Sequence, residues 1–404
     1  MLRSLNDYRE IVGDGVLSEI YKKSLKICKK HIVHINSTYQ GGGVAEILPN
    51  LVALMNDAGI DTGWRILHGN SDFFAITKKF HNALQGEKIN LTRIKRRLYL
   101  ENNESFARFT HIHHDCVIIH DPQPLPLINF QRKHQPWIWR CHVDISDPDP
   151  ELWDFLKSFI LRYDVMIISD NKFYRKDLPI PQRIIYPSID PLSPKNMAIP
   201  EELIRKTLRK FKIPTDKPLI TQVSRFDKWK DPEGVIEVFQ RVKEEIDCRL
   251  VLCGSMAADD PEGMQIYNKI MGKPATQKLI QKKDLLVLTA ENQILVNTLQ
   301  RVSAVIIQKS LREGFGLTVT EALWKGTPVV ASRVGGIPNQ IIHEETGFLL
   351  EPDDYDGFAK IIVELLRDPG LCAEIGARGR EHVRKNFLIT RHLIDYLDLL
   401  GEVL

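Results

Sequence analysis

Short, continuously apolar runs recur along this chain and alternate with longer segments of helical periodicity. Apolar character without alternation is typical of strands that are buried on both faces, and intervening helices predict βαβ units with parallel strands. Twelve such runs are too many for one ordinary sheet but suit two. The predicted strands are residues 31–35, 63–67, 116–120, 137–141, 165–169, 183–186, 218–224, 249–253, 285–289, 304–308, 328–332 and 347–350.

A proline-rich stretch separates the sixth apolar run from the seventh. It contains Pro187, Pro191, Pro194 and Pro200. Proline disfavours regular structure and stiffens a connection, and a chain of 404 residues suits two domains of about 200 residues each. We therefore predict an α/β fold with two doubly wound, Rossmann-like domains, comprising residues 1–200 and 210–385. A ligand would lie in the cleft where the two domains face each other, at the carboxyl ends of the strands.

Charge and hydropathy exclude several classes of protein. The net charge of +3 is too small to indicate a nucleic-acid partner. No apolar run approaches the length of about 18 residues that a membrane-spanning helix needs, and the first residues lack the apolar core of a secretory signal. Six cysteines are spread without metal-site or redox spacing, which favours a reducing compartment. We expect a cytoplasmic protein that binds neither nucleic acid nor membranes.

A glycine-rich loop follows the first predicted strand. It extends from Asn36 through Gly41, Gly42 and Gly43 and opens a helix. Glycines at such a junction let backbone N–H groups approach a phosphate or a sugar at the positive end of the helix. The loop is not a P-loop, because no G-K-[ST] sequence follows. A tight turn without a ligand is the alternative.

A basic loop follows the first strand of the second half, with the sequence Ser-Arg-Phe-Asp-Lys-Trp-Lys-Asp over residues 224–231. Arg225 offers a planar fork and Lys230 a compact charge, which together could neutralise a diphosphate at the strand end. The alternative is a solvated basic loop. Its place at the carboxyl end of a first strand favours a binding site.

A second glycine loop follows the strand at residues 304–308. Gly314 and Gly316 free the backbone before a helix predicted at 317–325, and this geometry presents N–H groups to an anion. Glu313 and Glu321 lie eight residues apart, one in the loop and one on the helix. Carboxylates near a phosphate site can accept hydrogen bonds from sugar or ribose hydroxyls. Glu321 alone would pass for an ordinary acidic residue on a helix surface.

The E-x7-E pattern from Glu313 to Glu321, with S-R-F-D-x-W-K upstream, resembles the retaining glycosyltransferases with two Rossmann-like domains, the GT-B fold. The resemblance covers essentially the whole chain and is closest to the trehalose glycosyltransferring synthases. The segments that carry it are residues 36–48 around Gly41-Gly-Gly-Val-Ala-Glu, 80–86 (Phe-His-Asn-Ala-Leu-Gln-Gly), 120–124 (His-Asp-Pro-Gln-Pro), 137–144 (Trp-Ile-Trp-Arg-Cys-His-Val-Asp) and 187–193 (Pro-Ser-Ile-Asp-Pro-Leu-Ser).

The resemblance implies a role for each matching residue. Arg225 and Lys230 would bind the donor diphosphate, Glu321 the ribose, and Glu313 the hydroxyls of the transferred glucose. The implied donor site comprises Gly42, Gly43, Arg225, Lys230, Glu313, Gly314, Phe315, Gly316, Leu317, Thr318 and Glu321. The implied acceptor site comprises Asn36, Asp121, His142 and Asp144. The catalytic residues would be Glu313, Arg225, Lys230 and His142. The last helix, 386–404, would pack back on the first domain.

The implied reaction makes trehalose from a nucleoside diphosphate glucose and glucose, reversibly and with retention. We expect no required cofactor, with a divalent metal in an accessory role at most. Front-face substitution needs no protein nucleophile, whereas double displacement would use an enzymic carboxylate. The alternatives for function are a retaining trehalose phosphorylase, a transferase with another acceptor, and a non-catalytic nucleotide-sugar sensor. The sequence leaves open the donor base, the physiological direction, the acceptor range and the oligomeric state, with a homodimer as one alternative.

Three further patterns have structural interpretations. Asp147-Pro-Asp149 resembles a D-x-D metal motif, but a proline follows each acid. The histidines of residues 111–114 precede an apolar strand and are read as a polar loop. The basic run at residues 93–97 is typical of a solvated helix face.

Overall fold

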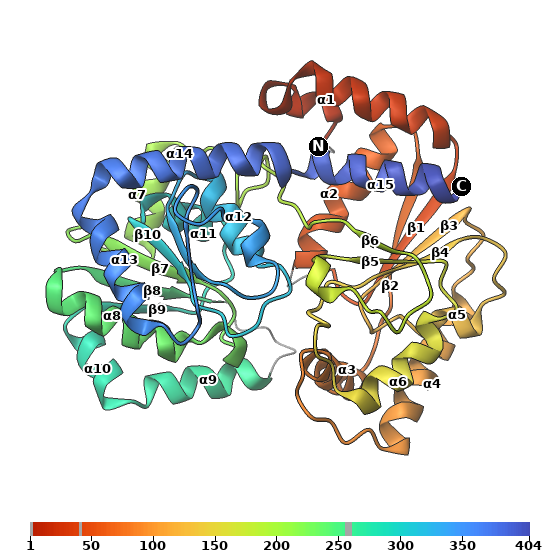
Figure 1. The fold of residues 1–404 in the computed structure, drawn as a ribbon, viewed down its shortest axis with the longest axis horizontal. Helices are drawn as coiled ribbons and strands as arrows, with labels where there is room; N and C mark the ends of the chain where they lie inside the picture. The colour runs from red at the N-terminus through yellow and green to blue at the C-terminus, as the bar shows by residue number, and fades with distance from the viewer. Residues whose placement is uncertain (1–2, 40–42, 255–260) are drawn as a thin grey trace. The chain divides into compact units, whose positions relative to one another are not determined.

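The computed structural model describes residues 3–39, 43–254 and 261–404 of the chain. Contacts divide the chain into two compact units (Figure 1), one comprising Met1–Ser188 with Leu388–Leu404 and the other Ile189–Phe387. Each unit contains a six-stranded, all-parallel sheet, which confirms the predicted α/β class with two Rossmann-like domains. In the part of the chain described, no helix is long and apolar enough to cross a membrane.

The first sheet has the strand order β2-β1-β3-β4-β5-β6. Its strands are β1 (His31–Asn36), β2 (Asp61–Ile66), β3 (Cys116–His120), β4 (Trp137–Arg140), β5 (Val165–Ile168) and β6 (Gln182–Ile184). All six overlap predicted strands. The chain starts at β1, next to the edge of the sheet, then adds β2 on one side of β1 and β3 to β6 on the other. This reversal beside β1 places the carboxyl ends of β1, β3 and β4 next to one another, where a ligand binds in such sheets.

Helices cover both faces of the first sheet. They are α1 (Arg9–Ser24), α2 (Gly43–Asp57), α3 (Ser71–Leu84), α4 (Arg93–Phe109), α5 (Leu127–Phe130), α6 (Pro150–Ile160) and α15 (Ile389–Val403), with short 3-10 turns at Leu5–Tyr8, Leu25–Ile27 and Asn171–Phe173. The C-terminal α15 contacts both α1 and α2 (Figure 1). Its apolar stripe, which includes Leu393, Leu397 and Leu400, is buried there.

The second sheet has the order β12-β11-β10-β7-β8-β9. Its strands are β7 (Leu219–Val223), β8 (Arg249–Cys253), β9 (Leu285–Leu288), β10 (Val305–Gln308), β11 (Val329–Ser332) and β12 (Phe348–Leu350). Here β7 and β10 are adjacent at the centre, so that the loops that follow them meet at the carboxyl edge. These two loops, with the helix that follows the second, carry the predicted donor-binding residues of this unit.

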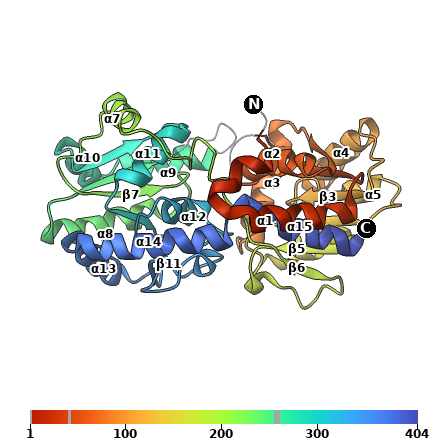
Figure 2. The same cartoon turned by 90° about the horizontal axis from the view of Figure 1, so that it is seen from above.

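The helices of the second unit are arranged on both faces of its sheet. They are α7 (Glu201–Lys210), α8 (Pro232–Glu245), α9 (Pro261–Met271), α10 (Pro274–Gln281), α11 (Gln293–Val302), α12 (Leu317–Trp324), α13 (Tyr355–Arg367) and α14 (Pro369–Asn386), with 3-10 turns at Lys228–Lys230 and Ile337–Asn339. Figure 2 shows α8 and α13 on one side of the sheet and α7 and α11 on the other. Alternate residues of β8 face the two sides, because Leu250 packs in the core under α8 and α13 while Val251 packs under α11.

The C-terminal helical segment begins later than predicted. Asn386 ends α14 rather than starting the last helix, and α15 begins at Ile389. Between them Phe387 and Leu388 leave helical geometry, with ψ of 19° and 155°, and both side chains are buried. The break falls where the contacts pass from one unit to the other, at Phe387–Leu388. Residues 189–200, which we had placed in the first domain, are grouped by their contacts with the second unit.

Candidate functional site

The loop after β7 is a hydrogen-bonded turn that holds the basic side chains. Asp227 caps the 3-10 turn Lys228–Lys230, because its Oδ1 accepts a hydrogen bond of 2.8 Å from the amide of Trp229. Its second oxygen lies 3.7 Å from Arg225 Nη2. The carbonyl oxygen of Lys230 accepts a hydrogen bond of 2.8 Å from Gln222 Nε2 on β7. The Arg225 side chain is 40% exposed, so its guanidinium remains accessible to a ligand while it is tethered to Asp227.

The loop after β10 brings Glu313 to the basic loop. Glu313 Oε2 forms an ion pair with Lys230 Nζ, and both side chains are largely buried. The amide of Leu311 donates a hydrogen bond of 2.7 Å to the carbonyl of Trp229, which joins the two loops through the backbone. The structure thus places two of the predicted catalytic residues, Lys230 and Glu313, in direct contact.

The start of α12 presents unpaired amides beside this ion pair. Gly316 has φ of 85° and caps the helix without a side-chain hydrogen bond. Among the residues described, none accepts a hydrogen bond from the amides of Leu317 and Thr318. These amides and the helix dipole make the loop a suitable anion site. A Cβ atom added at Gly316 would approach Glu313 Cγ to 3.2 Å, so the glycine also leaves room for the carboxylate side chain.

Glu321 lies on the first turns of α12 and is completely buried. Its Oε1 lies 2.8 Å from Lys195 Nζ, and its Oε2 accepts a hydrogen bond of 3.3 Å from Gln300 Nε2. Gln300 in turn accepts a hydrogen bond of 2.8 Å from Lys325 at the other end of α12. Burial and these partners rule out the interpretation of Glu321 as an ordinary surface acid.

The backbone of Gly335 and Gly336 packs directly against the Glu313 loop. This contact was not predicted from the sequence. Gly335 has φ of +50°, and a Cβ atom there would overlap the carbonyl oxygen of Glu313. Gly336 donates its amide to the carbonyl of Gly314 at 3.1 Å. The double glycine two residues after the apolar run 328–332 was an available signal, because it combines φ freedom with close backbone approach. Gln340 completes the support by donating to the carbonyl of Phe315.

Two lysines were also missed. Lys309 is completely buried, pairs with Asp231 and lies 4.0 Å from the centre of the Tyr355 ring. It anchors the β10 loop to the start of α8, where Asp231 caps the helix through the amide of Gly234 at 3.0 Å. Lys195 comes from the proline-rich stretch that we read as a connection. Only tertiary packing brings that stretch against α12.

The predicted first-domain residues gather at the carboxyl edge of the first sheet. Asp121 directly follows β3 and has φ of 64°, a left-handed conformation that Asp tolerates. Its Oδ1 accepts a hydrogen bond of 2.8 Å from the amide of His142 after β4. Burial raises the pKa of Asp121 to about 6, against the opposing effects of the His142 amide and the Arg140 charge. Asp121 therefore fixes the backbone that carries His142.

Asn36 and Asp144 are engaged in local hydrogen bonds. The Asn36 side chain donates to the carbonyl of Thr38 at 2.6 Å and accepts from Trp64 Nε1 at 2.8 Å. Asp144 Oδ1 accepts from both the amide and the hydroxyl of Ser146. These hydrogen bonds shape the loops at the carboxyl edge. The contacts of Asn36 and Asp144 with sugars remain predictions. Gly43 is the exposed first residue of α2, and Gly42 lies outside the described residues.

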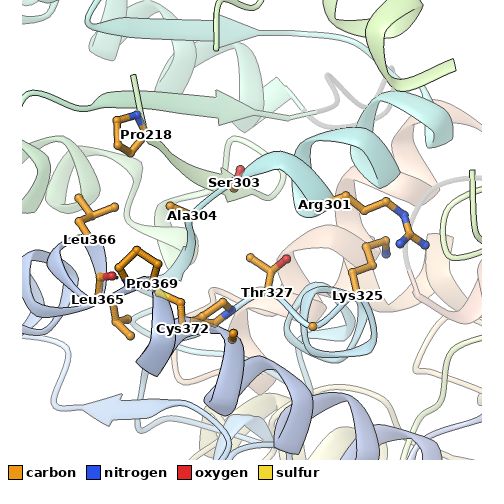
Figure 3. Close-up of a pocket in the computed structure, with 13 residues that line it drawn as sticks. Pro218, Arg301, Ser303, Ala304, Lys325, Thr327, Leu365, Leu366, Pro369 and Cys372 are labelled. Carbon is orange, nitrogen blue, oxygen red and sulfur yellow. Dashed lines mark hydrogen bonds between the residues drawn. The ribbon is translucent and has the colours of Figure 1, made fainter. Parts of the chain in front are cut away.

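A cavity of about 400 Å³ lies in the second unit (Figure 3). Pro218, Ala304 and Pro328, which line it, directly precede β7, β10 and β11. It therefore opens at the amino ends of the strands, opposite the edge that carries Glu313.

Asp149 of the D-x-D-like motif caps α6 through the amide of Leu152 at 3.1 Å, which supports the structural interpretation of that motif.

Models of known protein families match both halves of the chain. Residues 34–175 match the family model "Trehalose synthase, N-terminal domain", and residues 204–382 match "Glycosyl transferases group 1". The chain is 49% identical to a trehalose synthase of Thermococcus litoralis, over 99% of this chain and 97% of that protein. It is 28% identical to a trehalose phosphorylase of Grifola frondosa, over 95% of this chain but 59% of that protein.

A solved structure shares the fold at low sequence identity. It is a UDP-forming α,α-trehalose-phosphate synthase from Burkholderia xenovorans, in complex with glucose-6-phosphate. The TM-score is 0.73 at 14% identity, and the match covers 92% of this chain and 99% of that one. At this identity the likeness supports the GT-B fold alone.

Proposed function

This chain belongs to the trehalose synthase family of glycosyltransferases, and we propose that it transfers glucose from a nucleoside diphosphate glucose to glucose, forming trehalose reversibly. The observation that carries the proposal is the Lys230–Glu313 ion pair beside the unpaired amides of α12. It places a cation, a carboxylate and helix N–H groups at one edge of one sheet. This combination suits a sugar joined to a diphosphate.

The departing diphosphate needs its developing charge stabilised. Arg225 and Lys230 supply cations, and the backbone between Gly314 and Thr318 supplies amides at the positive end of α12. Glu313 would accept hydrogen bonds from the hydroxyls of the glucose, and Glu321 from those of the ribose. His142, held by Asp121, would contact the sugars from the first unit. We propose that these groups suffice without a required cofactor.

The stereochemistry follows from same-face attack. In this mechanism the acceptor hydroxyl attacks the anomeric carbon as the bond to the diphosphate breaks, and its proton passes to the leaving phosphate oxygen. The new bond therefore forms on the face that the diphosphate leaves, with retention. Double displacement would instead form a covalent glycosyl-enzyme on a carboxylate. Trapping that adduct in a slowed variant, and mapping it by mass spectrometry, would overturn the front-face mechanism.

One incubation separates the proposed reaction from its nearest alternative. The protein is mixed with trehalose and ADP, GDP or UDP in parallel, and with inorganic phosphate in a further sample. We expect the glucose nucleotide and glucose from at least one nucleotide. Glucose 1-phosphate from the phosphate sample alone would assign the phosphorylase reaction, and no product from any sample would favour a sensor.

A pair of variants tests the site within that assay. Glu313→Gln removes the carboxylate charge, and we expect turnover to fall by roughly 100-fold. Glu364→Gln changes an exposed glutamate of α13 in the same unit and should leave turnover unchanged. Near-normal turnover in Glu313→Gln would remove Glu313 from the site.

A further inference from the structure

Three histidines of the first unit form a continuous hydrogen-bonded chain. His34 Nδ1 lies 2.9 Å from His120 Nε2, and His120 Nδ1 lies 3.1 Å from His142 Nε2. Successive ring centroids are 5.2 and 5.4 Å apart, in stacked arrangement. The chain connects the buried interior of β1 with the loop after β4 that carries His142.

Strand register places these rings on one face of the sheet. His34 is opposite Ile118 and His120 is opposite Arg140. Since side chains alternate along a strand, His34, His120, Arg140 and His142 all lie on the same face. The α15 helix lies on this side, where the Tyr396 ring centroid is 5.9 Å from that of His34.

All three rings are neutral at ordinary pH. Burial lowers the pKa of His34 to about 3 and holds the pKa values of His120 and His142 well below their usual range. The buried guanidinium of Arg140 lowers the pKa values of His120 and His142 further by its positive charge. A neutral imidazole carries one N–H and one lone pair, so each link has one donor and one acceptor.

The chain of neutral rings therefore has two polarities. In one, each Nδ1–H donates to the next Nε2, and His142 ends with an N–H at Nδ1. In the other, each Nε2–H donates back toward β1, and His34 ends with an N–H at Nε2. His34 is completely buried, and its Nε2 has no hydrogen-bond partner among the described residues. A buried N–H without an acceptor is rarer and less tolerable than a buried lone pair. The first polarity is therefore favoured.

We propose that His34 and His120 are positioning residues that lock His142 in the Nδ1–H tautomer, so that His142 offers a substrate oxygen a donor. No described residue accepts a hydrogen bond from His142 Nδ1, and its ring is partly exposed at the carboxyl edge. Its Nε2 lone pair is occupied by His120, so His142 cannot act as a general base. The assignment of a sugar hydroxyl as the acceptor rests on the proposed function, whereas the tautomer does not.

The tautomers can be measured directly in the full-length protein. Labelling with ¹⁵N-histidine distinguishes protonated from bare ring nitrogens by chemical shift, and single replacements assign the three signals. We expect His34, His120 and His142 all to carry the proton on Nδ1. An Nε2–H tautomer or an imidazolium at His142, near neutral pH, overturns the proposal. The tautomers are read from the wild-type spectrum and the replacements serve only to assign its signals, so the result does not depend on turnover.

Two variants of His34 test its functional consequence. His34→Asn keeps an N–H close to the position of Nδ1, whereas His34→Leu has a similar volume and no donor. We expect His34→Asn to keep the wild-type His142 tautomer and kcat. His34→Leu should give a mixed His142 tautomer and a kcat about tenfold lower, the worth of one hydrogen bond. Equal kcat in the two variants would overturn the positioning role. Wild-type tautomers without transfer from any donor would instead contradict the proposed function.

Discussion

Gly335 supports the backbone of Glu313 so closely that a single methyl group there should displace the site. Alanine at φ of +50° carries a conformational cost of about 1–2 kcal/mol, offset by roughly 0.4–1 kcal/mol from the less flexible unfolded chain. The added Cβ would also overlap the Glu313 carbonyl oxygen and lie 2.7 Å from its carbon. Overpacking of this kind typically costs about 1–3 kcal/mol. Gly335→Ala should therefore lose about 2–4 kcal/mol of stability.

Two further glycines of the same unit separate the conformational cost of a positive φ from the cost of steric overlap. Gly326 has φ of +76°, but a Cβ atom there would meet nothing closer than the Gly376 carbonyl at 3.7 Å. Gly326→Ala thus measures the conformational cost alone, which we expect to be about 1 kcal/mol or less. Gly336 lacks a positive φ, but a Cβ atom would lie 2.8 Å from the Phe315 ring and 2.9 Å from the Gly314 carbonyl. Gly336→Ala measures the overlap alone.

Two assays measure these effects. Stability is measured by urea unfolding, monitored by circular dichroism, and turnover is measured as trehalose synthesis from the accepted donor. Gly335→Ala should lose turnover by roughly 100-fold, because a shift of about 1 Å in a reacting group has that effect. Gly326→Ala should keep turnover, since Glu313 stays in place. The reasoning is refuted if Gly335→Ala loses no more stability than Gly326→Ala and turns over normally.

Three other predictions concern charged groups. Lys230→Met should cost about 3 kcal/mol in urea unfolding because it strands the buried Glu313 carboxylate, and adding Glu313→Gln should restore stability but not turnover. Lys195→Met should weaken binding of the accepted nucleoside diphosphate about tenfold in calorimetry, because Lys195 orients Glu321; unchanged affinity would remove this role. Burial raises the pKa of Asp121 from 3.8 to about 6, so the folded state keeps a proton that the unfolded state has lost. As pH rises from about 4 to 6, wild type should lose roughly 3 kcal/mol relative to Asp121→Asn, and a constant difference in urea unfolding would contradict this.

The positions of the strands along the chain were predictable, because a strand buried on both faces is a continuous apolar run in the sequence. Cys116–His120 and Val305–Gln308 are recognisable as apolar runs whatever their partners are. The glycines after Glu313 likewise indicate a turn whose backbone adopts conformations that favour glycine, such as the φ of +85° at Gly316. Their match to a known family then specified a reaction class, which the family comparisons support.

The ends of elements were less predictable. Asn386 continues an amphipathic pattern, yet it ends α14, because the chain leaves one unit at Phe387 and enters the other at Leu388. The proline-rich stretch appears in sequence as a connection only. Its Asn196 nevertheless accepts hydrogen bonds from Trp324 and Lys325, which fixes the stretch against α12.

The sequence by itself determined two doubly wound sheets and the glycine-rich and basic loops at their carboxyl edges. Each of these follows from periodicity or from a residue's own conformational needs. Tertiary structure alone decided that Lys195 faces Glu321, that Gly335 supports Glu313, and that His34 reaches His142 through His120. These contacts join residues far apart in the chain. They depend on strand register and on loop packing, which no local pattern encodes.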